Sequence, residues 1–158
     1  MDINRITYND KLFIKYDGGK LKLRTPPMRI PFGLEQSYGK KLLKLELTNL
    51  ESNPNMKLLY KYIKNIEKSN QEKLDVGPAQ YKSCLYHSKN FQPLLTTKIE
   101  ERYGKIICDI ISNEDYVLKT IYDFKKNDKV VVDLVFDRLW NFKNKTGCIV
   151  KVVKIVCV

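Results

Sequence analysis

Acidic side chains are in short supply in this sequence. It has 18 Asp and Glu residues against 29 Lys and Arg residues, which gives a formal net charge of +11 at pH 7. Arginine is scarce among the cations, with five residues against 24 lysines. A surface this basic attracts polyanions, most commonly nucleic acid, and lysine can hold a phosphate as a point charge without reading bases. The alternative is a lysine-coated, solvated surface that has no polyanionic partner.

Residues for the common metal and nucleophile sites are also lacking. The chain has one histidine, His87, and its cysteines form no CxxC pair, which argues against a zinc ribbon or a His-based metal cluster. No GxSxG, P-loop, HExxH or GxGxxG motif occurs. Any catalysis would therefore have to rest on carboxylates. The cysteines, which we expect to be small buried hydrophobes, are Cys84, Cys108, Cys148 and Cys157.

Long apolar runs are absent as well. No stretch approaches the roughly 18 apolar residues of a membrane span. Residues 1–5 lack the charged and then apolar pattern of a secretory signal, so we expect an intracellular protein with no membrane partner. A length of 158 residues with 43% hydrophobic residues suits one domain, spanning residues 1–158, with a core of its own.

Short runs of alternating apolar and polar residues predict a β-rich chain. The expected strands are Lys11–Tyr16, Lys20–Thr25, Lys41–Leu50, Tyr81–Tyr86, Leu94–Glu100, Lys105–Ile111, Lys129–Phe136 and Cys148–Val158. Gly-containing turns at 17–19 and 102–104 predict hairpins. Three prolines within 25–33 favour a loop or an edge over a central strand, and 138–147 is expected to be a loop.

One helix is predicted after the third of these strands. Asn53 is its expected N-cap and Pro54 its first residue, and it should end near Lys68. Its apolar face would comprise Met56, Leu59, Ile63 and Ile66. Residues 69–80 are expected to form a surface connection, and 115–122 could form a helical turn. The predicted fold is a β-rich α+β domain, an OB-fold-like small barrel with one main helix and additional strands.

The segment 138–147 combines aromatic side chains with three cations and no acid. Flat rings can stack on bases while the cations hold phosphates, which is what a single-strand platform needs. The candidate nucleic-acid-binding residues here are Arg138, Trp140, Phe142, Lys143 and Lys145. Trp140 could instead pack under the rim of the barrel. Tyr103, in the turn at 102–104, is a further candidate for stacking.

A second basic stretch runs from residue 20 to residue 44 and contains only one acid, Glu35. Its candidate phosphate-binding residues are Lys20, Lys22, Arg24, Arg29, Lys40 and Lys41. Strand alternation would place the first three on one face, where they could follow a phosphate backbone or be simply solvated. We expect Phe32 and Tyr38, within the same stretch, to pack in the core or at its rim.

Two other patterns allow competing interpretations. Asp109, Asp133 and Asp137 lie in predicted strands, and a two-metal nuclease site built on them is conceivable. Acidic residues on such strands more often face water or pair with lysines. Lysines recur on one side of the predicted helix. They could form a second contact surface for nucleic acid or a partner protein, or simply the solvent-exposed face of an amphipathic helix. They are Lys57, Lys61, Lys64 and Lys68.

The proline-rich run LRTPPMRIPFGL at 23–34, followed by the strand Lys41–Leu47, resembles the opening of single-stranded DNA-binding proteins of nucleo-cytoplasmic large DNA viruses. These are related to the podophage-type replication protein of the same function. Trp140, Gly147 and the closing Val/Ile strand are similar to that family's last hairpin.

The resemblance implies an OB-fold that coats single strands during viral replication, recombination or repair, without base-specific readout or a cofactor. It also implies a viral replication site in the host cytoplasm or nucleus. One feature departs from the phage members, whose acidic C-terminal tail recruits replication partners. This chain ends in the basic, apolar segment 151–158, which leaves recruitment through a tail open.

Three hypotheses follow from the sequence. The first is non-catalytic, largely sequence-independent binding of single-stranded DNA. The second is an OB-like interaction subunit whose basic surface meets an acidic protein, and the third is a metal-dependent nuclease. RNA, replication proteins and a second copy of the chain remain open as further partners.

Overall fold

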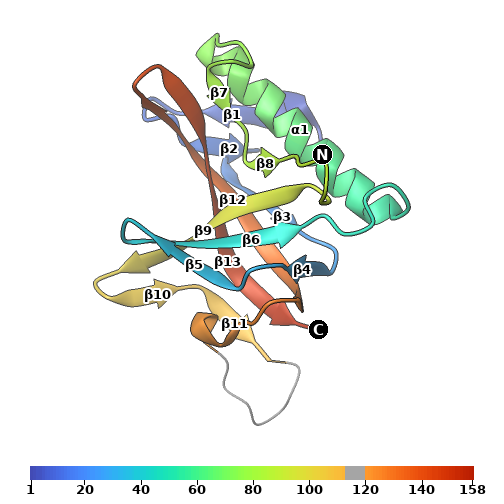
Figure 1. The fold of residues 1–158 in the computed structure, drawn as a ribbon. Helices are drawn as coiled ribbons and strands as arrows, with labels where there is room; N and C mark the ends of the chain where they lie inside the picture. The colour runs from blue at the N-terminus through green and yellow to red at the C-terminus, as the bar shows by residue number, and fades with distance from the viewer. Residues whose placement is uncertain (113–119) are drawn as a thin grey trace.

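The computed structural model describes residues 1–112 and 120–158. Within these ranges the chain forms one long helix, α1 (Pro54–Leu74), two 3-10 helices, η1 (Ile3–Arg5) and η2 (Ile121–Asp123), and a sheet of thirteen strands (Figure 1). The strands are β1 (Ile6–Tyr8), β2 (Ile14–Tyr16), β3 (Gly19–Arg24), β4 (Met28–Ile30), β5 (Leu34–Ser37), β6 (Lys40–Glu46), β7 (Tyr81–Lys82), β8 (Leu85–Tyr86), β9 (Leu94–Arg102), β10 (Lys105–Ile107), β11 (Asp109–Ile111), β12 (Asp128–Phe142) and β13 (Lys145–Cys157).

The hairpin of β12 and β13 is the scaffold of the fold. The two strands pair along nearly their whole length, with register shifts at Asp133/Leu134 and Phe136/Arg138. Strands β3 and β4 pair with β12, whereas β7, β9 and β11 pair with β13. Alternate residues of the hairpin are apolar, most of them β-branched, and face the core, as strand periodicity requires. The most deeply buried are Val130, Val132, Leu134, Phe136, Val150, Val152 and Ile155.

Five strands are linked in a ring of pairings around the hydrophobic core. The order is β12, β4, β6, β9, β13 and back to β12. Two of the links are single residue pairs, Arg29 with Glu46 between β4 and β6 and Lys98 with Lys151 between β9 and β13. The β-rich, OB-type arrangement with one main helix that the sequence predicts is confirmed.

Helix α1 begins as predicted and ends six residues later than predicted, at Leu74. The Asn53 side chain accepts hydrogen bonds from the backbone amides of Asn55 and Met56, at 3.0 and 3.3 Å. All four predicted apolar residues are buried, and so are the polar Glu67 and Asn70. These two occupy core positions where the sequence pattern shows no apolar residue, which is why periodicity placed the end of the helix too early.

Glu67 and Asn70 are buried because each finds hydrogen-bond partners. The Glu67 carboxylate accepts from the Ser83 hydroxyl at 2.6 Å and from the Cys84 amide at 3.0 Å. The Asn70 side chain donates to the Tyr81 hydroxyl at 2.9 Å and accepts from the Tyr8 hydroxyl at 2.6 Å. These bonds attach the helix to the strands at its two sides.

Strand β4 corrects the expectation that the proline-rich segment stays out of the sheet centre. Met28–Ile30 pairs with β12 on one edge and with β6 on the other, and Met28 and Ile30 are fully buried. Pro27 and Pro31 flank the three residues instead of interrupting them. Their missing amides therefore fall outside the ladder, where they leave no hydrogen bond unmade.

The predicted loop at 138–147 is almost entirely strand. Only Lys143 and Asn144 form the turn, both with positive φ, 49° and 61°. Two-residue turns with this backbone match the twist of the flanking strands. Aromatic residues favour strands, and Leu139 and Thr146 point into the structure, so the ladder continues to the tip.

The remaining expectations are largely confirmed. The turns at 17–18 and 103–104 join hairpins, and the segment 81–86 contains two short strands, β7 and β8. The segment 105–111 divides at Cys108, because β10 pairs with β9 whereas β11 pairs with β13. Of the ambiguous segment 115–122, residues 115–119 lie outside the described residues, and Ile121 begins η2.

The four cysteines are free, with Cys157 buried and the other three half-buried. Burial raises the pKa of the Cys108 thiol to about 12, which keeps it protonated at neutral pH. In the described part of the chain, no helix combines the length and apolar character needed to cross a bilayer.

The Asn70 hydrogen bonds predict a specific stability loss. In Asn70→Ala the Tyr81 hydroxyl loses its recorded partner, and we expect the free energy of unfolding to fall by about 1–3 kcal/mol. Urea unfolding followed by far-ultraviolet circular dichroism measures this change. Lys68→Ala, an exposed position on the same helix, is the control and should change stability by less than about 0.5 kcal/mol. Equal unfolding midpoints for the two variants would contradict a structural role for Asn70.

Candidate nucleic-acid interface

A groove of about 640 Å³ opens between the β2–β3 hairpin, the β5–β6 turn, the end of β9 and the outward face of the β12–β13 hairpin. In Figure 1 these segments meet on the left of the molecule, where several hairpin tips point outward. Eight cations line this groove: Lys15, Lys20, Lys40, Lys41, Lys98, Arg102, Arg138 and Lys151. Three carboxylates also line it: Glu100, Glu101 and Asp137.

The three carboxylates each pair with a cation inside the groove. Lys41 pairs with Glu101, and the Arg102 guanidinium lies 3.1 Å from Glu100. The Lys151 ammonium lies 3.3 Å from Glu100 and 3.2 Å from Asp137. Partial burial raises the pKa of Glu100, but Lys151 and Arg102 outweigh it, so this pKa lies below its usual range.

Five groove cations have no carboxylate within ion-pair distance among the described residues. They are Lys15, Lys20, Lys40, Lys98 and Arg138. They come from five different strands, so their charges meet only in the folded chain. The groove therefore carries uncompensated positive charge along its length, and a polyanion would relieve the mutual repulsion.

Lys98 and Lys151 are direct neighbours in the sheet. They form the single parallel pair between β9 and β13, which brings two ammonium groups to one face. Like charges on adjacent strands are unfavourable. Glu100 and Asp137 offset the charge of Lys151, whereas Lys98 is left for an anion from outside the protein.

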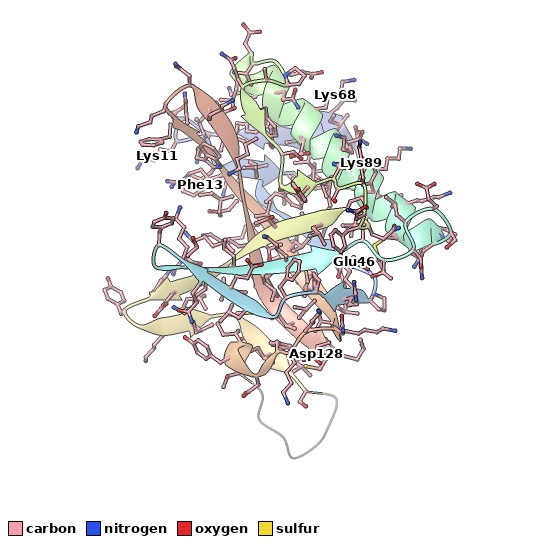
Figure 2. The ribbon with its side chains drawn as sticks, viewed as in Figure 1. Lys11, Phe13, Glu46, Lys68, Lys89 and Asp128 are labelled. Carbon is pink, nitrogen blue, oxygen red and sulfur yellow. The ribbon has the colours of Figure 1, made fainter. Side chains whose placement is uncertain are left out.

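Phe13 forms an aromatic wall of the groove beside Arg138. The Arg138 guanidinium lies over the Phe13 ring, 5.3 Å from its centroid. Residues 12 and 13 are fixed to β12 by two backbone interactions. Phe13 and Arg138 form a backbone bridge, and the Leu139 amide donates a hydrogen bond to the Leu12 carbonyl at 3.0 Å. Figure 2 shows Phe13 and Lys11 on this side of the opening.

Two tyrosines project from hairpin tips at the mouth of the groove. Tyr38 and Tyr103 are fully exposed, and each precedes a glycine and a lysine, so the tripeptide Tyr-Gly-Lys occurs at both tips. The neighbours of both tyrosines, Gly39 and Arg102, line the groove. The expectation that Tyr38 packs in the core or at its rim is wrong, because the tight turn carries its side chain beyond the sheet.

Both tyrosines adopt a backbone that bulky side chains avoid. Each has φ of 50°, followed by Gly39 with φ of 75° and Gly104 with φ of 76°. This type of two-residue turn favours Asn-Gly or Asp-Gly, since positive φ disfavours other residues. A tyrosine at either position therefore does not stabilise its turn. The repeated tripeptide is the sequence signal that could have identified Tyr38.

The predicted site residues divide between the groove and other places. Lys20, Lys40, Lys41 and Arg138 line the groove, and Tyr103 stands at its rim. Lys22 is exposed on the same face of β3 as Lys20, as alternation predicts. Sequence reasoning missed further groove residues, which come from separate strands and carry no local signal. These are Phe13, Lys15, Lys98, Arg102 and Lys151.

Arg24 and Arg29 lie outside the groove and are held in ion pairs within the fold. Arg24 donates two hydrogen bonds to Asp133, at 2.7 and 3.1 Å, and this interaction lowers the pKa of the carboxyl. Arg29 pairs with Glu46 and donates to the Asn127 side chain at 2.6 Å. Both guanidinium groups fix one strand to its neighbour.

Apart from Arg138, the predicted aromatic and basic cluster lies at the far end of the β12–β13 hairpin, beyond the groove. Trp140 is half-buried against Gly147, where an added Cβ would lie 2.7 Å from the indole ring. Phe142 is exposed, with the Lys143 ammonium 5.2 Å from its ring centroid. Lys145 donates to a backbone carbonyl, that of Ala79, at 2.9 Å.

The acidic candidates for a metal site do not come together. Asp133 and Asp137 are each paired with a cation, and Asp109 is exposed on β11. No group of three or more metal-type ligands gathers within residues 1–112 and 120–158. His87 hydrogen-bonds the Tyr60 hydroxyl at 3.0 Å, in agreement with the hydrogen-bonded role expected for a lone histidine.

A comparison with models of known protein families and one with curated proteins give no match. Solved structures do match. The single-stranded DNA-binding protein from bacteriophage Enc34, in complex with ssDNA, aligns at 10% identity with a TM-score of 0.59, covering 97% of this chain and 93% of that one. This chain shares the fold of phage single-stranded DNA-binding proteins.

Two further structures agree. Another structure of the Enc34 protein aligns at 14% identity with a TM-score of 0.59, covering 96% of this chain and 87% of that one. Gp2.5, a single-stranded DNA-binding protein encoded by bacteriophage T7, aligns at 11% identity with a TM-score of 0.53, covering 89% of this chain and 87% of that one. Because identities are this low, the likeness concerns the fold, and the site residues have to be argued from this chain.

The strained turns predict that their tyrosines reduce stability. In Tyr38→Asn and Tyr103→Asn a residue that tolerates positive φ replaces one that does not. We expect the free energy of unfolding of each variant to rise by up to about 1 kcal/mol, so that it unfolds at a higher urea concentration. Chemical unfolding followed by circular dichroism measures this difference. If both variants are less stable than the parent, the tyrosines stabilise the fold, and the idea that they are held for another purpose fails.

Proposed function

We propose that this protein binds single-stranded DNA, largely without regard to sequence and without catalysis, in viral DNA replication, recombination or repair. The observation that carries the proposal is the groove, where eight cations face three paired carboxylates beside Phe13 and the two exposed tyrosines. The fold shared with phage single-stranded DNA-binding proteins, one of them solved with ssDNA, supports it.

The composition of the groove favours a single strand over a duplex. Exposed aromatic rings stack on bases, whose faces are accessible in a single strand and covered in a duplex. Five of the groove cations have no acidic partner within the described part of the chain, and four of these are lysines, which contact phosphates without the forked geometry that reads base edges. The groove thus suits a strand of any sequence, held by its backbone and by stacking.

The proposal extends to the organisation and setting of the protein. Residues 1–158 would act as a single nucleic-acid-binding domain. The resemblance of the proline-rich run and the last hairpin supports a place among the single-stranded DNA-binding proteins of nucleo-cytoplasmic large DNA viruses, at a replication site in the host cytoplasm or nucleus. Trp140, Phe142, Lys143 and Lys145 would contact the strand where it leaves the groove toward the hairpin tip.

The first test compares a labelled single-stranded pyrimidine oligonucleotide with a duplex of equal length, by fluorescence anisotropy at low and moderate salt. We expect preferential binding of the single strand and strong weakening by salt, because phosphate contacts release counterions. With magnesium present, the oligonucleotide should stay intact. Equally weak binding of both would contradict the proposal and favour an acidic protein partner, whereas cleavage would favour the nuclease hypothesis.

Two groove lysines predict a change in salt dependence. We expect the double variant Lys20→Gln/Lys98→Gln to reduce the slope of log K against log salt by about 1.4, since each phosphate neutralised on a single strand contributes about 0.7. Lys61→Gln/Lys64→Gln is the matched control, because it removes the same charge from the exposed face of α1. If both double variants lower the slope equally, the effect comes from net charge and the groove assignment is wrong.

A further inference from the structure

Three exposed aromatic side chains surround a second cavity, away from the groove. Phe32, Tyr86 and Phe91 are 51%, 62% and 60% exposed, and all three line a pocket of about 560 Å³. Single apolar side chains on a surface are ordinary, but three aromatic rings at one cavity indicate a binding site. We call this cavity the aromatic pocket. Phe32, which is expected from the sequence to pack in the core or at its rim, is instead half-exposed and lines this pocket.

The aromatic pocket is basic as well as aromatic. Among the residues that the structure describes, its charged lining residues are Lys44 and Lys82, and none of the lining residues is a carboxylate. The Lys44 ammonium lies 5.7 Å from the centroid of the Phe32 ring. The same ammonium lies 3.6 Å from the carboxylate of Glu35, which does not line the pocket. Lys82 is exposed. Flat rings beside ammonium groups suit a ligand that carries both planar groups and negative charge.

The aromatic pocket and the part of the groove that Lys98 lines lie along the same face of two paired strands. In the register of β6 with β9, Lys44 is opposite Thr96 and Leu42 is opposite Lys98. Opposed residues and alternate residues point to one face, so Lys98 and Thr96 share that face about 7 Å apart along β9. Thr96 lines the aromatic pocket and Lys98 lines the groove. In Figure 1, β6 and β9 run side by side from the hairpin tips toward β8.

We infer that one single strand of nucleic acid occupies both cavities, running from the groove along the β6–β9 face into the aromatic pocket, where Phe32, Tyr86 and Phe91 stack on its bases. This inference rests on the proposed function and adds a second subsite to it. Continuity with the groove and the cationic lining favour a nucleic acid strand over a protein segment as the occupant. The aromatic pocket therefore sets the length of strand that one protein molecule holds.

The test is a length series. Thymidine oligonucleotides of about 5 and about 16 nucleotides lie at the ends of the range that one OB fold covers. We expect the parent protein to bind the long one more tightly, and Tyr86→Ser/Phe91→Ser to bind the short one like the parent. For the long one, this variant should lose about 5-fold or more in affinity for each stacked base.

Two control variants sharpen the result. Tyr103→Asn, at the rim of the groove, should weaken binding at both lengths. Leu58→Ser removes an exposed apolar side chain on α1 and should change neither. Lys82→Gln leaves the aromatic rings in place and should lower the salt slope only for the long oligonucleotide.

The outcomes separate the two proposals. If the parent protein binds neither length, the proposed function fails. If it binds both but Tyr86→Ser/Phe91→Ser keeps the full gain with length, or loses equal affinity at both lengths, only the second subsite is overturned. An unchanged salt slope in Lys82→Gln at both lengths also overturns the second subsite. Because Lys82 is exposed, this variant tests the subsite without disturbing the packing of the fold.

Discussion

The pairing of β12 with β13 is the constraint on which the rest of the structure depends. Its turn uses two residues in the left-handed region, Lys143 and Asn144, so the strands continue to the tip and present long ladders on both edges. One edge binds β3 and β4, and the other binds β9, β7 and β11. The groove is lined by the hairpin itself, by β3 and β9, and by β2 and β6, which pair with β3 and β9. The hairpin therefore fixes the positions of the groove cations directly or through these strands.

Arginine and lysine have different roles in this protein. Four of the five arginines, Arg5, Arg24, Arg29 and Arg102, are paired with carboxylates, and the pairs of Arg24 and Arg29 join neighbouring strands. The rigid guanidinium fork suits such fixed contacts. The uncompensated charge of the groove is mostly lysine, whose flexible ammonium can follow a backbone of variable shape. The low arginine content is thus consistent with binding that does not read bases.

The exposed tyrosines and the aromatic pocket show where folding and binding make opposite demands. A tyrosine at positive φ and a phenylalanine on an open surface both disfavour the isolated folded chain. Several such residues lie around two cavities that are lined by lysine. Aromatic rings that do not stabilise the core are available to stack on a ligand, which is the physical link between this fold and its proposed function.

The sequence by itself determined the local features. Alternation predicted most strands, Asn53 and Pro54 predicted the start of the helix, glycine turns predicted two hairpins, and the excess of lysine predicted a polyanionic partner. These follow from interactions between residues close in the chain. The sequence did not reveal the continuation of α1 past Lys68, because buried polar residues interrupt the apolar pattern there. It also did not reveal the central strand β4, because prolines flank it on both sides.

Only the tertiary structure decided which cations act together. Lys20 and Lys98 lie in one groove because strands far apart in the chain pair in a particular register, and a shift of one residue would turn either side chain to the opposite face. Strand register likewise brings Arg24 to Asp133 and Arg29 to Glu46. Among the described residues it leaves four groove lysines without a carboxylate at ion-pair distance: Lys15, Lys20, Lys40 and Lys98. A sequence specifies its charges, but the register between distant strands decides which charges meet a carboxylate and which remain for a ligand.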